Sequence, residues 1–146
     1  MATWTIEDLA KAMGRIDFTM LTTRTEGGAL ATRPMSNNGE VEYRGDSFYF
    51  SWDSARLVRD IEADPMVGLS FQGQSIAGLL GKPPLFVAVQ GKGRIIRDRA
   101  AFAEHWSEDL DRWFPQGIET PGVAMIHVRA TRIHYWDGED QGEITP

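Results

Sequence analysis

The sequence predicts a mainly β domain in which an antiparallel sheet or barrel carries peripheral helices. Segments with strand character outnumber those with helical periodicity, and several of the connections between them are short. The chain has 146 residues, of which 42% are hydrophobic and 25% are charged, so it can bury the core of one ordinary globular domain. No internal repeat, low-complexity tract or linker divides it, and we therefore expect a single domain over residues 1–146.

The chain opens with a short amphipathic helix. Its apolar residues recur at helical spacing: Ile6, Leu9, Ala10 and Met13. Thr5 can cap the N-terminus of this helix together with Asp8, and Gly14 is a suitable end.

A hairpin and an aromatic strand are predicted next. Residues 18–23 and 29–35 are rich in β-forming side chains, and the glycine pair at 27–28 between them predicts the turn. The Asn-Asn-Gly sequence at 37–39 predicts a second turn, and residues 47–52 form a strongly aromatic strand.

The second helix has Asp53 and Ser54 as candidate caps and ends before Pro65. Its apolar positions are Leu57, Val58 and Ile61. Residues 66–71 predict a short strand. Residues 72–84 are rich in glycine and proline and predict a loop that is long enough to be functional or mobile.

A long strand, a third helix and a last strand complete the chain. The long strand covers 85–97, and two glycines inside it predict a bulge or a close backbone approach: Gly91 and Gly93. Asp98 can cap the third helix, whose apolar stripe consists of Phe102, Trp106, Leu110 and Trp113. The last strand covers 124–136, and we expect residues 137–146 to form a frayed acidic tail.

Composition excludes several classes of protein. The net charge of −6 argues against a nucleic-acid binder, and the absence of cysteine excludes disulfides and thiol chemistry. The three histidines lack zinc-ligand spacing, so we expect no metal site. The N-terminus lacks the pattern of a secretory signal and no stretch is apolar enough to span a membrane, so we expect a cytoplasmic protein without membrane contact.

One constellation of residues suits a flat, phosphorylated ligand. The aromatic strand ends at Ser51 and Trp52, just before the second helix, and three basic residues lie near it in the predicted fold: Arg33, Arg56 and Arg59. A helix N-terminus, a hydroxyl and an arginine fork suit a phosphate, and an aromatic strand end can pack a flat ring. The alternative is an ordinary surface helix whose arginines pair with Asp60 and Glu62, and the residues alone favour this alternative about two to one.

Six segments, in order along nearly the whole chain, carry a family likeness. They are 31–35 (Ala-Thr-Arg-Pro-Met), 48–52 running into 56–61, 64–67, 89–93, 106–117 and 133–137. In this order and spacing they resemble the pyridoxamine 5′-phosphate oxidase-like, flavin-binding split-barrel proteins, and within these the bacterial general stress protein 26 group.

The resemblance implies a six-stranded antiparallel split β-barrel with peripheral helices, forming a homodimer with two FMN sites between the subunits. It assigns eight residues to the cofactor: Thr32, Arg33, Met35, Phe50, Ser51, Trp52, Arg56 and Trp113. The first three would lie along the isoalloxazine ring, and the next three would flank the ring and the ribityl chain. Arg56 would hold the phosphate, and Trp113 would reach the site from the other subunit.

Two positions depart from the family pattern. Leu57 stands where relatives commonly place a lysine, which removes one phosphate contact, and Trp52 stands where a small polar residue is usual. The implied function is that of an FMN-binding general stress protein acting as a flavin-dependent oxidoreductase. FAD in place of FMN, a non-catalytic flavin binder and a cofactor-free dimer are the alternatives. No residues for a pyridoxal phosphate substrate are identifiable, so we do not expect genuine pyridoxamine phosphate oxidase activity.

Overall fold

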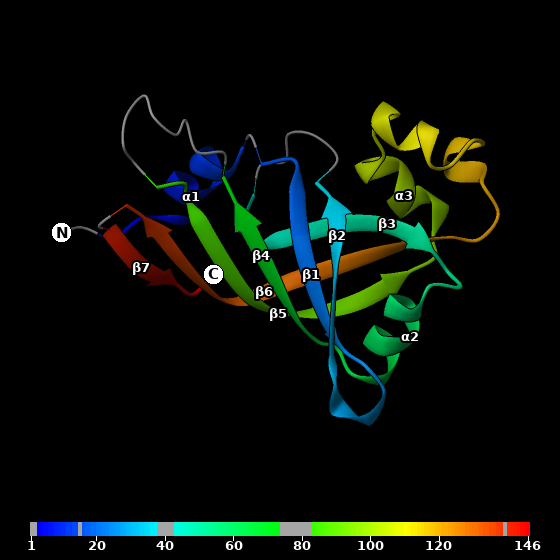
Figure 1. Ribbon diagram of the computed structural model, residues 1–146. Helices are drawn as coiled ribbons and strands as arrows, with labels where there is room; N and C mark the ends of the chain where they lie inside the picture. Colours follow the sequence, from blue (N-terminus) through cyan, green and yellow to red (C-terminus); the bar gives the residue numbers. More distant parts are fainter. Residues whose placement is uncertain (1–2, 15, 38–42, 74–82, 139) are drawn as a thin grey trace.

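A computed structural model describes residues 3–14, 16–37, 43–73, 83–138 and 140–146, and its strands form one antiparallel sheet (Figure 1). The strands are β1 (Phe18–Arg24), β2 (Leu30–Ser36), β3 (Asp46–Trp52), β4 (Met66–Gln72), β5 (Phe86–Ile96), β6 (Val123–Asp137) and β7 (Asp140–Ile144). The helices are α1 (Ile6–Met13), α2 (Arg56–Ala63) and α3 (Arg99–His105), and the short 3₁₀ turns are η1 (Glu26–Gly28), η2 (Glu108–Arg112) and η3 (Gly117–Glu119).

The hydrogen-bonded order of the six main strands is β2-β1-β4-β5-β6-β3, so β2 and β3 are the two ends of the order. The expectation of a six-stranded antiparallel sheet with peripheral helices is confirmed. The frayed tail expected for 137–146 is wrong, because β7 pairs with the end of β6. A turn at Gly138, which has a φ of 64°, reverses the chain there, and Ile144 pairs with Ile133.

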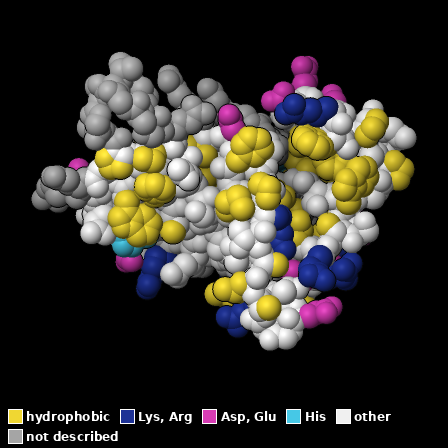
Figure 2. Space-filling model, in the orientation of Figure 1, with side chains coloured by type: hydrophobic (Ala, Val, Ile, Leu, Met, Phe, Trp, Pro, Cys, Tyr) yellow, Lys and Arg dark blue, Asp and Glu magenta, His cyan; other side chains and the backbone are white. Residues whose placement is uncertain are grey.

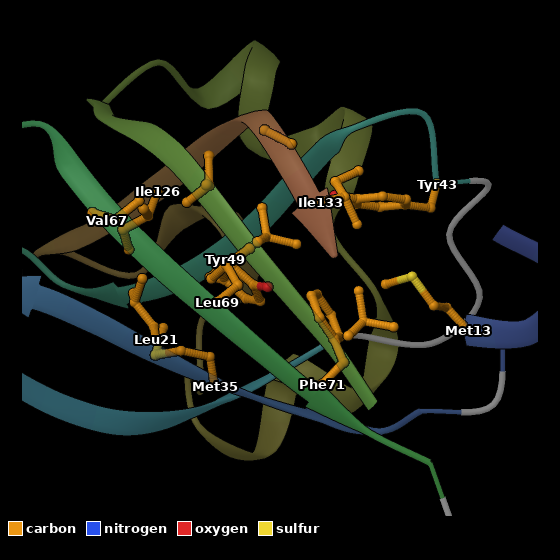
Figure 3. Packing of buried hydrophobic residues seen from close by; sticks show 14 of the residues in the cluster. Met13, Leu21, Met35, Tyr43, Tyr49, Val67, Leu69, Phe71, Ile126 and Ile133 are labelled. Atoms are coloured by element: carbon orange, nitrogen blue, oxygen red, sulfur yellow. The ribbon is translucent and has the colours of Figure 1, made fainter. Parts of the chain in front are cut away.

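The core fills the interior of the curved sheet. Inward side chains of β1, β4, β5 and β6 alternate with outward ones, as the strand period of two requires. Figure 3 shows Leu21, Leu69 and Ile126 from different strands within this interior, with Met13 of α1 at one side. A separate apolar cluster on the α3 side is formed by Phe50, Phe102, Leu110, Phe114, Val123 and Met125.

The predicted irregularity in β5 is confirmed. The register between β5 and β6 shifts at Gln90 and Gly91, where β6 carries one extra residue. A Cβ atom on Gly91 would lie 2.7 Å from the Arg129 carbonyl oxygen, so only glycine fits this approach. The extra residue also shifts the alternation of inward and outward side chains along β6. His127 and His134 therefore project from the same outer face, although they are an odd number of positions apart.

The helix predictions are confirmed for α1 and corrected in detail for the other two. Thr5 and Asp8 form a reciprocal capping box on α1. Asp53 and Ser54 do not cap α2, whose N-cap is Ala55, because the Asp53 carboxylate accepts a hydrogen bond from Arg97 instead.

The apolar stripe from Phe102 to Trp113 does not form one helix. The backbone becomes extended at Trp106, where α3 ends, and the 3₁₀ turn η2 follows. The Trp106 indole N–H donates to Asp111 at 3.0 Å and its ring packs on Phe50, so the break is stabilised by both contacts.

A loop is expected over 72–84, and residues 74–82 of it lie outside the described residues. Positions 38–39 of the predicted Asn-Asn-Gly turn also lie outside them. The ends of the longer segment are joined by a hydrogen bond from the Gly73 N–H to the Leu85 carbonyl. In the described part of the chain, every helix is too short or too polar to cross a membrane.

The glycine at the β5 bulge generates a prediction about stability. We expect Gly91→Ala to lower the free energy of unfolding by about 1–3 kcal/mol, because its methyl group would overlap a backbone carbonyl that cannot move freely. Gly68→Ala is the matched control, since a Cβ there would meet its neighbours at 3.7 Å or more. Urea denaturation measures both variants, and equal stability of the two would contradict the steric argument.

Candidate functional site

A cavity of about 390 Å³ lies between the two ends of the sheet order, where the β2 and β3 edges approach each other. Its lining comes from the ends of β2 and β3, the start of β1, the first turn of α2 and the η2 segment. The residues are Phe18, Arg33, Pro34, Met35, Ser36, Phe50, Ser51, Trp52, Leu57, Leu110, Arg112, Trp113 and Phe114. Figure 2 shows hydrophobic side chains gathered over this part of the surface, with Lys and Arg side chains over neighbouring α2. The volume is typical of small-molecule sites.

The structure brings six of the eight residues assigned by the family resemblance to this cavity. They are Arg33, Met35, Phe50, Ser51, Trp52 and Trp113. Thr32 is not among them, because it alternates with Arg33 and points to the outer face of the sheet, where its hydroxyl bonds to Thr22. Arg56 is also elsewhere: successive helical residues diverge by about 100°, so Leu57 enters this cavity while Arg56 lines a neighbouring groove.

Within the single chain, Trp113 lines this cavity together with Phe50, Ser51 and Trp52 of β3. The resemblance assigns it to the site of the other subunit, and that assignment stays a prediction. The neighbours of Trp113, Leu110 and Phe114, are buried in the α3-side cluster and fix its place beside this cavity. Trp113 is 60% exposed, and the Arg112 guanidinium lies 5.6 Å from the centre of its ring, a cation–π distance.

Aromatic side chains form one wall of the cavity. Phe50 contacts Trp106 with ring centres 4.8 Å apart in an edge-on arrangement, and Trp52 lies 4.9 Å from Phe114. Trp52 remains 42% exposed, so one part of it is free to contact a ligand. Such a wall is suited to the face of a planar ring.

Arg33 is the main cation of the cavity, and a buried carboxylate holds it. Its Nη1 donates to the Thr23 hydroxyl at 2.8 Å, and its Nη2 lies 3.7 Å from the Asp60 carboxylate. The Thr23 hydroxyl donates in turn to Asp60 at 2.9 Å. Burial lowers the pKa of Arg33, which the charge of Asp60 opposes and that of Arg56 reinforces. Arginine nevertheless stays protonated at neutral pH, and the Asp60 carboxylate offsets part of its charge.

Sequence reasoning missed several lining residues. Pro34 and Ser36 flank Met35, and Arg112 and Phe114 flank Trp113, so their position beside assigned residues is the only signal that could have found them. Phe18 comes from β1, and no local pattern connects it with this site.

The cavity therefore combines an apolar, aromatic interior with arginine and serine groups at its margin. The hydroxyls of Ser36 and Ser51 can donate or accept hydrogen bonds, while Arg33 and Arg112 supply positive charge. This arrangement can bind a planar aromatic molecule that carries polar and anionic groups.

Solved structures similar to this chain share the fold of nearly all of it. A protein of Clostridium acetobutylicum related to general stress protein 26 of Bacillus subtilis, from the pyridoxinephosphate oxidase family, has a TM-score of 0.77 at 16% identity, covering 96% of this chain and 93% of its own. The general stress FMN/FAD binding protein of Xanthomonas citri has a TM-score of 0.69 at 21% identity, covering 92% and 89%. A heme binding protein of Mycobacterium smegmatis has a TM-score of 0.75 at 16% identity, covering 99% and 60%.

These likenesses define the fold class as the split barrel that the family resemblance implies. A comparison with curated proteins found no significant match. A family model described as pyridoxamine 5′-phosphate oxidase like matches residues 5–145, and the chain belongs to that family.

The buried Asp60 generates a prediction about the site. We expect Asp60→Asn to lower the free energy of unfolding by about 2 kcal/mol, because Arg33 would lose its counter-charge and Thr23 a charged acceptor. Glu62→Gln removes an acid from the exposed face of the same helix and should change stability little. Chemical denaturation at neutral pH checks this, and equal effects of the two substitutions would contradict the role of Asp60.

Proposed function

We propose that this protein binds FMN in the cavity between β2 and β3 and acts as a flavin-dependent oxidoreductase of the general stress protein type. The observation that carries the proposal is the combination, in one cavity, of an aromatic wall with the fixed charge of Arg33. A flavin needs both, since its ring is flat and apolar and its phosphate is anionic.

The residues present fit a flavin phosphate. Trp52 and Trp113 can cover the faces of the ring, and Met35 and Leu57 supply apolar contacts beneath it. Ser51 can hydrogen-bond to polar atoms of the ligand. When bound, the flavin supplies the redox chemistry, and the protein contributes binding, orientation and electrostatics.

Arg56 and Arg33 are the cations proposed for the phosphate. Arg56 lies one residue before the cavity-lining Leu57, and its charge is close enough to influence the pKa of Arg33. Leu57 carries no charge, so the phosphate has one contact fewer than a lysine there would provide. Each charge-assisted hydrogen bond contributes about 1.5–3 kcal/mol, so its absence lowers FMN affinity by about tenfold or more.

The neighbours support a flavin without establishing it for this chain. The Xanthomonas citri protein is described as FMN/FAD binding, whereas the Mycobacterium smegmatis protein is described as heme binding. The arginines that line the cavity can form charge-assisted hydrogen bonds with the phosphate of a flavin, and this supports the flavin proposal.

A homodimer is the proposed assembly. Large apolar side chains remain exposed on the outer face of the sheet, among them Met20, Phe86 and Trp136 at about 40% exposure each. They come from β1, β5 and β6, and the inward side chains of those strands already fill the core. A second copy of the chain would remove these apolar surfaces from water.

The flavin proposal makes a spectroscopic prediction. Protein mixed with excess FMN and then desalted should keep the absorption bands of the oxidised flavin, and Arg56→Gln should weaken FMN binding about tenfold. Arg132→Gln is the control, since this exposed arginine on β6 lies outside the lining of the cavity. Protein that retains no FMN would overturn the proposal. Turnover of a nicotinamide reductant by the loaded protein separates an oxidoreductase from a passive flavin binder.

The dimer proposal is tested by sedimentation. We expect the wild-type protein to sediment as a dimer and Phe86→Glu to shift it towards monomer, because a charge would enter an apolar contact. Gln90→Glu is the matched control, since it adds the same charge on the same face of β5 without removing an apolar side chain. A monomeric wild-type protein at micromolar concentration would contradict the assembly.

A further inference from the structure

Positive side chains form a band on the outer face of the sheet, across the neighbouring strands β5 and β6. We call it the basic band and define it by four residues: Lys92 and Arg94 of β5, and Arg129 and Arg132 of β6. All four are exposed. They belong neither to the lining of the cavity nor to the exposed apolar residues proposed for the dimer.

The strand register places like charges against each other in this band. Lys92 lies directly opposite Arg129, and Arg94 follows Lys92 two residues later on the same face of β5. The Cβ atoms of directly opposite residues are about 5 Å apart, so like charges at such positions destabilise a sheet. A negatively charged partner would relieve this repulsion.

Counter-charges on the adjoining strands are too few to balance the band. Asp46 of β3 accepts a hydrogen bond from Arg129 at 3.1 Å, and no other carboxylate of the described ranges lies within ion-pair distance of the four cations. On the other side, β4 places the uncharged Met66 opposite Lys92. The four cations thus outnumber their one carboxylate by three, although the net charge of the chain is −6.

Arg94 is held in place by an uncharged acceptor. Its Nε–H donates to His127 Nδ1 at 3.0 Å, and arginine has no acceptor atom, so this imidazole nitrogen carries no proton. The other nitrogen, Nε2, is therefore the N–H of a neutral ring, and it donates to Asp46 at 2.7 Å. The bond orients the Arg94 guanidinium and leaves its positive charge uncompensated.

A stack of three rings supports His127 from the side of α3. Phe48 of β3 stacks on His127 with ring centres 4.7 Å apart, and on its other face it stacks on His105 of α3 at 3.6 Å. The nearby Glu104 carboxylate of α3 lies 3.9 Å from His105, on the far side of this stack from Arg94. Groups that are already ordered lose less conformational entropy when a partner binds, so this support favours binding at Arg94.

We propose that the basic band docks an acidic segment of a partner protein in an extended conformation, with Lys92 and Arg94 binding carboxylates two residues apart. Residues i and i+2 of a strand lie about 6.6 Å apart on one face, and the same holds for an extended peptide, so the spacing of cations and carboxylates matches. A nucleic acid fits less well. The net charge of −6 repels it, and both faces of Phe48 are already covered and cannot stack on a base.

Fluorescence anisotropy with a labelled synthetic peptide of alternating glutamate and threonine tests the proposal. We expect the peptide to bind more weakly as salt rises, and Lys92→Gln combined with Arg94→Gln to weaken binding about tenfold at low ionic strength. Arg24→Gln combined with Arg59→Gln is the matched control, since it removes the same charge from exposed arginines outside the band. Arg94→Lys keeps the charge without the planar group that His127 orients, and we expect it to weaken binding about threefold.

Two further probes decide the nature of the partner. A peptide with the same number of glutamates in one uninterrupted run should bind about threefold more weakly, and equal binding of the two peptides would overturn the proposed spacing. Duplex DNA that binds more tightly than either peptide, with the same dependence on Lys92 and Arg94, would overturn the acidic segment in favour of a nucleic acid. Absence of peptide binding at low ionic strength, or equal losses in the band and control variants, would overturn the docking surface itself.

Discussion

Among the described residues, the edges of β2 and β3 do not pair with each other, and this is the constraint on which the rest of the molecule depends. Edge strands expose backbone donors and acceptors, and a closed barrel would remove them by pairing the two edges. Here the ends of the strand order stay apart, and side chains meet between them instead of hydrogen bonds. Arg33 and Met35 come from one edge and Ser51 and Trp52 from the other. The cavity exists because the sheet does not close.

Helix α2 lies between the cavity and the neighbouring groove and contributes a different kind of side chain to each. Leu57 and Arg56 point in different directions because of the helical turn between adjacent residues, so apolar and cationic surfaces meet at one helix end. The buried Asp60 lies one turn further on and fixes Arg33 from the opposite side. Helix α2 thus carries two of these charges, Arg56 and Asp60, and holds the third, Arg33 of β2, between the two hollows.

The α3 side of the molecule supports the aromatic wall. Its apolar cluster is separate from the barrel interior, and it anchors Leu110 and Phe114 on either side of the exposed Trp113. The extended break at Trp106 allows this, since a continuous helix would have carried Trp113 away from the β3 edge. The departure from the predicted helix is therefore part of how the cavity acquires its outer wall.

Local chemistry determined much of what the sequence predicted. Alternation of apolar residues and the capping pair at Thr5 and Asp8 act over a few residues, and both are realised in the structure. The glycine at position 91 marks the strand irregularity in the sequence, although the close contact it permits is with Arg129 of β6. Predictions failed where a distant residue competed: Arg97 binds Asp53 and leaves Ala55 as the N-cap of α2, and pairing with β6 orders the acidic tail.

The candidate site likewise has features that local sequence predicts and features that depend on contacts between distant residues. By itself, the sequence determined the residue types that gather there, an aromatic strand end and arginines beside a helix, because their order along the chain is sufficient to indicate them. The tertiary structure alone decided that Thr32 faces outward, that Arg56 lies in a separate groove, and that Trp113 and Phe18 join the same cavity. Side-chain direction depends on strand register and helix rotation, and the meeting of distant segments depends on the curvature of the sheet, neither of which a local pattern specifies.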